Sequence, residues 1–223
     1  MDPGRVLWVA GGYLAGTLPS TYLAVRMARR ARAAGASAVA AGTGRAAGET
    51  DPHVLMMKHL GARWTAPAAT VDVVKGFAWA LAARHVGRLD PAWLAAAGTA
   101  VVLGHAFPFY LAEFSGRGLA AAAGVLLALL PVEMTIAGGL FLLGMAIRNS
   151  GLASTIGMGG VPAVASLRGQ PGGLVAMGAA IFLVILARRA VGVRALIAAG
   201  EPAGWALFRR LLFDASGPSH RRA

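Results

Sequence analysis

A short glycine turn that carries one cation follows a histidine in this chain, and the combination points to phosphate chemistry. The histidine belongs to Gly104-His105-Ala106-Phe107-Pro108, and the turn is Ser115-Gly116-Arg117-Gly118. Glycines let backbone N–H groups converge on a phosphate without interference from a Cβ carbon. A guanidinium binds phosphate oxygens in a fixed fork. Because the flanking residues are strongly apolar, we expect a phosphorylated substrate that is handled at a membrane surface.

The composition supports a membrane location. The chain is 57% hydrophobic and 13% charged, whereas a soluble domain carries about 25% charged residues. Cysteine is absent, which excludes disulfides and cysteine metal sites, and the five histidines show no metal-ligand spacing. We therefore predict no metal and no cofactor. The net charge is +12, but the basic residues are separated by apolar spans. This pattern favours membrane anchoring and contact with anionic lipids over nucleic-acid binding.

Six apolar stretches predict an all-α polytopic membrane protein. They are Val6–Met27, Ala66–Val86, Pro91–Ala112, Leu119–Ile147, Leu152–Leu167 and Gly172–Ala187. About 20 residues cross a bilayer core, so each of the first three is expected to form a single helix. The fourth has Pro131 and Glu133 at its centre and fits either one tilted helix or a hairpin of two short helices.

The positions of the arginines decide the orientation. Arginines follow both the first span and the last, so the loop and the tail at those places are expected in the cytoplasm and the N-terminus outside. An outside start and an inside end require an odd number of crossings. Dividing the fourth stretch gives about seven short transmembrane helices, which is our prediction. We expect a single domain over residues 1–223, with a cytoplasmic loop at 28–65 and a cytoplasmic tail at 188–223.

Four polar features on this frame have both structural and functional interpretations. Asp72 and Lys75 lie one helical turn apart and can pair, either as a structural ion pair or to shape a site. His105 fits a general base or a hydrogen-bond donor to substrate, or a buried histidine bonded to backbone. Arg117 in its glycine turn favours an anion site over a simple membrane anchor. Ser150 and Ser154 fit helix packing or backbone hydrogen bonding better than nucleophilic chemistry.

Taken in order, the motifs resemble those of the acyl-phosphate–glycerol-3-phosphate acyltransferases, the PlsY family of bacterial membrane enzymes. The resemblance runs through nearly the whole chain. Gly16-Thr17-Leu18-Pro19-Ser20 looks like the family's GS-x-P, Gly42-Thr43-Gly44-Arg45 like its GSGN, and Leu60-Gly61 with Asp72-Val73-Val74-Lys75-Gly76 like its LG…D-x-x-KG. Gly104–Pro108 through Ser115–Gly118 resembles GH-x-FP…GGKG, Arg148–Ser154 loosely resembles R-x-x-SLAS, and Arg194 falls on the second arginine of a tail motif H-R-E-N-I-R.

This resemblance implies a reaction and a location. A fatty acyl group would pass from acyl phosphate to the 1-hydroxyl of glycerol 3-phosphate, giving lysophosphatidic acid and inorganic phosphate, a step of phospholipid biosynthesis. The protein would lie in the bacterial cell membrane, with its active face toward the cytoplasm and membrane lipids around it. Because acyl phosphate is already activated, the protein has only to hold two phosphates and orient a hydroxyl near the carbonyl.

The resemblance also implies roles for particular residues. The catalytic residues would be Thr43, His105 and Arg117. Substrate and phosphate would be bound by Gly42, Gly44, Arg45, Lys58, Ser115, Gly116, Gly118 and Arg194.

The chain departs from the family pattern at several positions that would contact phosphate. Arg117 replaces the family's lysine, Arg45 replaces an asparagine, and Glu49 and Asp51 fall where the family has the neutral motif GATN. About four extra residues, Pro52 to Leu55, then precede Leu60, and Arg189 and Gly192 fall on the family's histidine and asparagine. A second hypothesis is therefore a catalytically degenerate paralogue that acts as a membrane binding or regulatory protein. A third is a small transporter, motivated by the two charges within one span.

Overall fold

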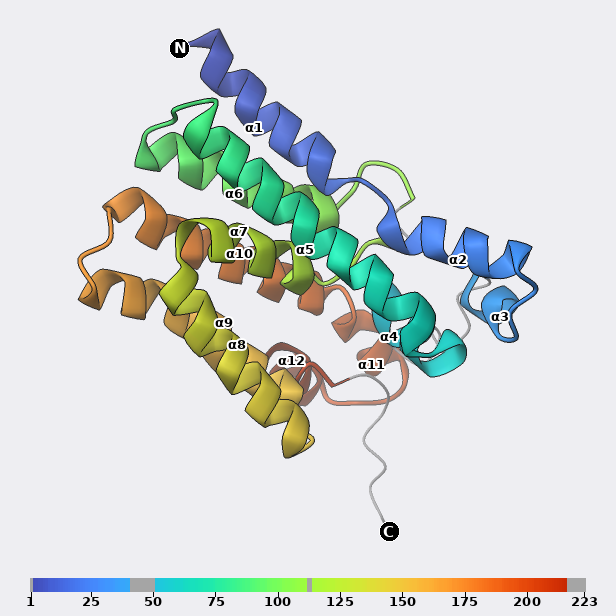
Figure 1. Cartoon of the computed structure of the whole chain (residues 1–223). Helices are drawn as coiled ribbons and strands as arrows, with labels where there is room; N and C mark the ends of the chain where they lie inside the picture. Colours follow the sequence, from blue (N-terminus) through green and yellow to red (C-terminus); the bar gives the residue numbers. More distant parts are fainter. Residues whose placement is uncertain (1, 41–50, 112–113, 216–223) are drawn as a thin grey trace.

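The computed structural model describes residues 2–40, 51–111 and 114–215, and within these ranges it contains α-helices and no β-strand (Figure 1). This confirms the predicted all-α class. The helices are α1 (Pro3–Gly16), α2 (Ser20–Arg30), α3 (Ala36–Ala40), α4 (Pro52–Leu60), α5 (Ala62–His85), α6 (Pro91–Ala106), α7 (Leu119–Leu129), α8 (Pro131–Ala146), α9 (Ser150–Leu167), α10 (Gly172–Ala190), α11 (Val193–Ala198) and α12 (Ala203–Phe213).

The longer helices form a bundle and the shorter ones gather around one end of it. Helices α1, α5, α6, α7 and α10 run alongside one another, and α8 and α9 form a second pair that packs on α7 and α10 (Figure 1). Helix α4 contacts α2 and α5, whereas α12 contacts α9 and α10. Segments far apart in the sequence, from the first loop and from the tail, therefore meet at the same end of the bundle.

The first apolar stretch contains a break, so the prediction of one helix over Val6–Met27 is wrong. Helix α1 ends at Gly16 and α2 begins at Ser20. The cause is Pro19, whose ring disfavours a helical conformation at the preceding residue, Leu18. At the break the carbonyl oxygen of Leu18 accepts the backbone N–H of Ser20 at 3.0 Å, and a side chain from α5 also donates to it, as described below.

Proline also divides the fourth stretch, as expected from the interpretation of this stretch as two short helices. Helix α7 ends at Leu129, and Pro131 is the first residue of α8, where its missing N–H costs nothing. The third stretch is shorter than the predicted Pro91–Ala112, because α6 ends at Ala106 just before Phe107-Pro108. The helical division of Leu119–Ile147 is confirmed, while the number of membrane crossings stays a prediction.

Glycines bring two pairs of helices into backbone contact near the residues of interest. A Cβ carbon on Gly16 would lie 2.1 Å from the carbonyl oxygen of Val101, and one on Gly104 would lie 2.1 Å from that of Tyr13. Between α5 and α7, a Cβ on Gly76 would lie 2.3 Å from the carbonyl oxygen of Ala121. Small residues allow this close packing between helices in membranes. It fixes the end of α1 against the end of α6, and the middle of α5 against α7.

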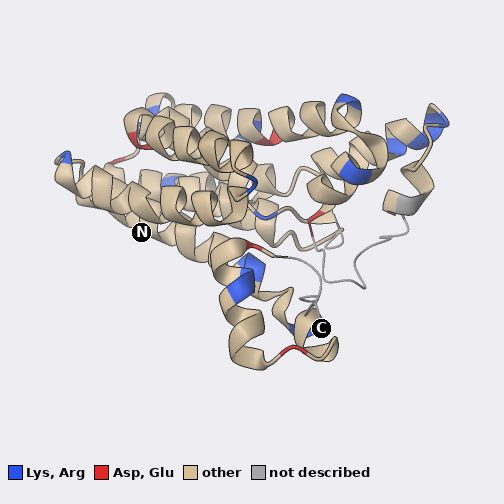
Figure 2. Cartoon of the chain, turned by 90° about the horizontal axis from the view of Figure 1, so that it is seen from below, with Lys and Arg blue, Asp and Glu red and all other residues tan. Residues whose placement is uncertain are grey.

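The surface is unusually apolar along the helices. Large side chains such as Leu7, Leu142 and Leu183 are exposed, on three different helices. Charged residues lie mainly toward helix ends and connections, and the middle stretches of most helices carry few of them (Figure 2). Among the described residues, only Gly172–Ala198 is both long and apolar enough to cross a bilayer, and three shorter apolar helices accompany it, namely Pro91–Ala106, Leu119–Leu129 and Pro131–Ala146.

Candidate active site

A fully buried carboxylate, Asp72 in the middle of α5, organises the polar residues near the α1–α2 break. The hydroxyl of Ser20 donates to its Oδ2 at 2.8 Å, and Lys75 Nζ lies 2.6 Å from its Oδ1. His53 Nε2 lies 3.1 Å from Oδ2, and His105 Nδ1 lies 3.4 Å from Oδ1. The predicted pairing of Asp72 with Lys75 is confirmed. The pair belongs to a larger cluster, which draws on α2, α4, α5 and α6.

Lys75 links this cluster to the helix break. Its Nζ donates to the carbonyl oxygen of Leu18 at 3.0 Å and lies 3.1 Å from His105 Nδ1. The break after α1 thus exposes a backbone acceptor, and the buried ammonium group uses it. Buried charged groups are tolerated when they are paired and hydrogen-bonded in this way.

His53 lies between two carboxylates. Its Nδ1 is 3.5 Å from Asp51 Oδ1, and its Nε2 is 3.1 Å from Asp72 Oδ2. Burial alone would lower the pKa of this imidazole, but hydrogen bonds to Asp51 and Asp72 outweigh burial and raise the pKa to about 10. His53 is therefore an imidazolium at neutral pH. It adds a positive charge to the site.

Asp51 joins His53 to the glycine turn. It is the N-cap of α4, where its Oδ1 accepts the backbone N–H of His53 at 2.8 Å. Its Oδ2 lies 3.2 Å from Arg117 Nε. Burial raises the pKa of the Asp51 carboxyl, but the hydrogen bond with His53 and the charge of Arg117 prevail and hold it well below its usual range. Asp51 is thus a fixed carboxylate.

Arg117 has a second carboxylate partner in the tail. It forms an ion pair with Asp214, the C-cap residue of α12. Two further guanidinium groups approach Asp214 Oδ1, with Arg189 Nε at 3.7 Å and Arg210 Nη1 at 4.0 Å. The side chains of Arg189 and Arg210 are fully buried. Three arginines from α10, α12 and the glycine turn therefore surround one carboxylate.

Backbone contacts hold the glycine turn in place. Arg188 donates to the carbonyl oxygens of Ser115 at 3.2 Å and Gly116 at 3.3 Å, and also to the Ser115 hydroxyl. Gly118 has a φ of 90°, a left-handed conformation that suits glycine, and it is the N-cap of α7. These contacts direct the side chain of Arg117 toward Asp51 and Asp214.

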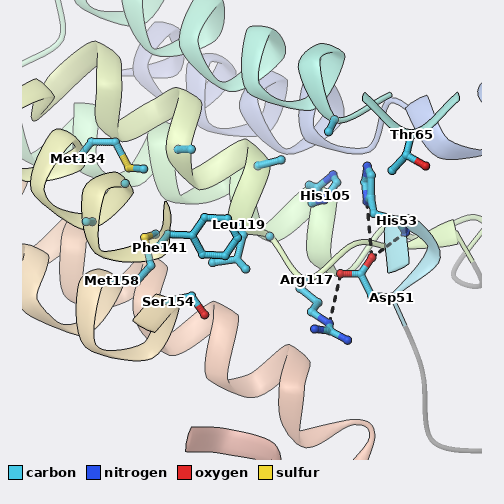
Figure 3. A pocket seen from close by; sticks show the side chains of 16 residues that line it. Asp51, His53, Thr65, His105, Arg117, Leu119, Met134, Phe141, Ser154 and Met158 are labelled. Carbon is cyan, nitrogen blue, oxygen red and sulfur yellow. Dashed lines mark hydrogen bonds and ion pairs between the residues drawn. The ribbon is translucent and has the colours of Figure 1, made fainter. Parts of the chain in front are cut away.

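A cavity of about 320 Å³ opens beside this polar cluster (Figure 3). One part is lined by charged and polar side chains, and the other by apolar ones. The polar lining comes from Asp51, His53, Thr65, His105, Arg117 and Ser154, and the apolar lining includes Leu119, Ala123, Met134, Ala137, Phe141 and Met158. Arg117 and the two histidines lie at one end and Met134, Phe141 and Met158 at the other (Figure 3). The cavity suits a molecule with a charged head and an apolar chain.

The structure brings some of the sequence-predicted site residues together and separates others. His105, Arg117 and Gly118 line the cavity, and Ser115 and Gly116 are buried in the turn that supports it. Lys58 on α4 and Arg194 on α11 are exposed and do not line it. Gly42, Thr43, Gly44 and Arg45 lie outside the described residues.

Sequence reasoning missed several residues of the cluster. Asp51 and Arg189 entered the sequence analysis only as departures from a family motif, and His53 and Asp214 did not enter it as site residues. Asp51-Pro52 is a typical helix start and predicts α4, but the partner that draws His53 into the cluster, Asp72, lies on another helix. Ser154 donates to the carbonyl oxygen of Gly151 and accepts from Arg189, both at 2.8 Å, which confirms the expected hydrogen bonding to backbone.

Comparisons with known proteins agree with this picture. The family model for glycerol-3-phosphate acyltransferase matches residues 6–199. Glycerol-3-phosphate acyltransferase 4 of Dehalococcoides mccartyi is 33% identical over 192 residues, which cover 81% of this chain and 92% of that protein. The glycerol-3-phosphate acyltransferase of Geobacter sulfurreducens is 31% identical, over 86% of this chain and 93% of that protein.

Two crystal structures of PlsY (YgiH), an integral membrane glycerol 3-phosphate acyltransferase, share the fold. The glycerol 3-phosphate form has a TM-score of 0.70 at 23% identity, and the match covers 89% of this chain and 94% of that one. The lysophosphatidic acid form has a TM-score of 0.68 at 22% identity. The resemblance read from the motifs is thereby confirmed: the chain belongs to the glycerol-3-phosphate acyltransferase family, the integral membrane acyltransferases of phospholipid biosynthesis.

Proposed function

We propose that the chain transfers a fatty acyl group from acyl phosphate to the 1-hydroxyl of glycerol 3-phosphate, giving lysophosphatidic acid and inorganic phosphate. The observation that carries this proposal is the two-part lining of the cavity. Arg117, His53 and His105 lie at its polar end, while Met134 and Phe141 lie at its apolar end. An acyl phosphate has the same two parts, with a dianionic head and an apolar chain.

The chemistry requires positioning more than a reactive side chain. The substrate hydroxyl oxygen attacks the acyl carbonyl carbon, the bond from that carbon to the phosphate oxygen breaks, and phosphate leaves with the electron pair and takes up the hydroxyl proton. Arg117 holds the phosphate, and the nearby His53 imidazolium stabilises the charge that develops. His105 orients the hydroxyl, because Asp72 and Lys75 fix its ring.

Further residues complete the proposed site. Thr43 hydrogen-bonds substrate, and Gly42, Gly44 and Arg45 contribute a phosphate loop. Lys58 and Arg194, which are exposed, attract the anionic substrates to this end of the protein. We also infer that this end faces the cytoplasm of a bacterial cell, with about seven short spans and the N-terminus outside. Residues of the first loop, the glycine turn and the tail meet here, at Asp51, Arg117 and Asp214.

One observation favours the second candidate, a membrane binding or regulatory protein without transfer activity. Both carboxylates that contact Arg117, Asp51 and Asp214, compete with phosphate for its guanidinium group. The two functions make opposite predictions for the same assay.

The test uses the full chain reconstituted in lipid nanodiscs. Palmitoyl phosphate is supplied with and without glycerol 3-phosphate, and both phosphate release and lysophosphatidic acid are measured. Acyl transfer predicts product that depends on glycerol 3-phosphate and is lost in Arg117→Ala. No product above that of the variant overturns the proposal and leaves the binding function. Palmitoyl coenzyme A in place of palmitoyl phosphate tests whether the donor must be an acyl phosphate.

A further inference from the structure

Asp214 places a negative charge at the centre of a buried group of arginines. Its carboxylate forms an ion pair with Arg117 and is approached by Arg189 and Arg210, and only 5% of its side chain is exposed. A phosphate group would be recognised by the same set of cations, because guanidinium groups bind carboxylates and phosphates with the same fork. The carboxylate of Asp214 thus stands in for an anionic ligand.

Several contacts hold the end of α12 against α9 and α10. Arg189 donates to the carbonyl oxygen of Leu211 at 2.8 Å, and the hydroxyl of Thr155 donates to that of Leu212 at 2.8 Å. Gly151 allows the closest approach, since a Cβ carbon there would lie 1.8 Å from the carbonyl oxygen of Phe213. The family model ends at residue 199, before α12 begins. The segment that presents Asp214 therefore lies outside the part of the chain that the family model matches.

The two carboxylates that contact Arg117 are not equally fixed. Asp51 caps α4 and is hydrogen-bonded to the backbone of His53, whose imidazolium also faces it. The contacts of Asp214 Oδ1 with Arg189 and Arg210 are 3.7 Å and 4.0 Å long, beyond hydrogen-bond distance. Burial also raises the pKa of the Asp214 carboxyl, although the three arginines act in the opposite direction. Within the described residues, the hydrogen bond with Arg117 is thus the one direct hydrogen bond of the Asp214 carboxylate, whereas Asp51 is also anchored to the backbone of α4, so we take Asp214 to be the partner that exchanges.

The charges of this group also leave room for a stronger anion. Among the described residues, Arg117, Arg189 and Arg210 contribute three positive charges and the His53 imidazolium beside Asp51 a fourth, whereas Asp51 and Asp214 contribute two negative ones. Arg117 contacts Asp51 through Nε and Asp214 through Nη1. A phosphate therefore cannot form two parallel hydrogen bonds with the terminal nitrogens of this guanidinium group while Asp214 remains bound to Nη1. A dianion that replaced Asp214 would gain the attraction of all three guanidinium groups.

We propose that Asp214 is an internal competitor for the phosphate site, which the phosphate of a substrate must displace from Arg117 before it can bind. Asp214 is in this sense a specificity-determining residue. Its carboxylate competes with every anion for Arg117, and only a dianion that makes further contacts with the protein binds in its place. The choice of a substrate phosphate as the displacing group rests on the proposed function, whereas the competition itself does not.

The test measures binding of inorganic phosphate to the full chain in nanodiscs by isothermal titration calorimetry. Two variants remove the charge of Asp214 and keep the helix end, because Asn and Gly both tolerate its left-handed φ of 52°. We expect Asp214→Asn and Asp214→Gly to bind phosphate about tenfold more tightly than the wild type, the effect of losing one competing charge-assisted contact. The gain should vanish when Arg117→Ala is added.

Two controls keep the charge or remove a different one. Asp214→Glu retains the competing carboxylate and should bind phosphate as the wild type does. Glu201→Gln removes a carboxylate of the same tail that is paired with Arg209 instead, and it should also leave the dissociation constant unchanged. Unchanged or weaker phosphate binding in both Asp214→Asn and Asp214→Gly, with melting temperatures near that of the wild type, overturns the proposal. If the melting temperature of one of the two variants is much lower than that of the wild type, phosphate binding by the other variant is used for the test.

Acyl transfer by the same variants separates this inference from the proposed function. We expect a lower KM for glycerol 3-phosphate in Asp214→Asn with little change in kcat. Tighter phosphate binding without transfer in any variant would refute the proposed function and support the competition. Acyl transfer by the wild type, together with an unchanged phosphate affinity in Asp214→Asn, would support the proposed function and refute the competition.

Discussion

Gly116 lies so close to His105 that a Cβ carbon on the glycine would be 2.1 Å from Nε2 of the imidazole ring. The ring therefore rests on the backbone of the glycine turn, while Asp72 and Lys75 hold its other nitrogen. The turn that carries Arg117 and the helix that carries His105 are thus fixed to each other by a contact that tolerates no side chain.

The first prediction concerns this contact. Gly116→Ala should displace the His105 ring and lower kcat for acyl transfer by about 100-fold, since shifts of about 1 Å in a catalytic group have effects of that order. The matched control is Gly139→Ala on α8, where a Cβ carbon meets nothing within 4 Å. Equal activities of the two variants in the nanodisc assay would contradict the proposed role of His105.

A second prediction concerns the buried carboxylate. Asp72→Asn removes the charge that faces Lys75 and His53, so the buried Lys75 loses its carboxylate partner and His53 keeps only Asp51. We expect a loss of about 3–5 kcal/mol in the free energy of unfolding, measured by denaturant titration in mixed micelles. The double variant Asp72→Asn/Lys75→Met should recover part of this loss. Additive losses in the double variant would show that the pair contributes no coupling energy.

The third prediction is a pH dependence of stability that His53 controls. Its pKa is about 10 in the folded protein, where the effects of Asp51 and Asp72 outweigh that of burial, and about 6.5 in the exposed group. The folded state therefore binds the proton more tightly, so this stabilisation is complete below about pH 6.5 and is lost as the pH rises toward about 10. The melting temperature of the wild type should fall more steeply from pH 7 to pH 10 than that of His53→Gln.

The flanking carboxylate predicts the opposite trend in a different range. The pKa of Asp51 lies below its usual value in the folded protein, so its contribution is present above about pH 4 and is lost only in strong acid. The two ranges do not overlap, so the titration of Asp51 does not contribute between pH 7 and pH 10, and the difference between the wild type and His53→Gln in that range reports on His53. Parallel melting curves for wild type and His53→Gln over that range would exclude a raised pKa at His53.

A fourth prediction concerns the apolar end of the cavity. Ala123→Leu adds three carbons to a half-buried residue of α7 that lines the cavity, and it should shift the preferred donor toward shorter acyl chains. The measurement compares kcat/KM for acyl phosphates of 10 to 18 carbons, a range on the order of common membrane acyl chains. Ala78→Leu, at an exposed position of α5, is the control and should leave the preference unchanged. The same preference for acyl-chain length in both variants would mean that the acyl chain does not bind beside Ala123.

Local chemistry made part of this structure predictable. Pro131 sets a helix start wherever it occurs, so the division of the fourth stretch followed from the residue itself. The spacing of Asp72 and Lys75 likewise determined that they face each other on a helix. In contrast, we did not predict the break at Pro19, because the apolar residues on both sides of it form one continuous stretch in the sequence.

Contacts between distant segments could not be predicted in the same way. Arg117 and Asp214 are 97 residues apart, and no local pattern connects them. His53 owes its place to Asp72, a residue of another helix. In the sequence alone, acidic residues near an expected phosphate site argue against phosphate binding, because their cationic partners are not known. The tertiary structure supplies those partners.

The shortness of α7 determines how far the glycine turn lies from the opposite end of this helix. Its 11 residues extend about 16 Å, roughly half of a hydrocarbon core of about 30 Å. Its far end lies near the ion pair of Glu133 with Arg168, and its near end begins at the glycine turn. The length of α7 therefore separates the glycine turn from the Glu133–Arg168 pair by about half the thickness of a bilayer core. Under the topology that we propose, the acyl donor reaches Arg117 from the lipid side, while glycerol 3-phosphate arrives from the aqueous side.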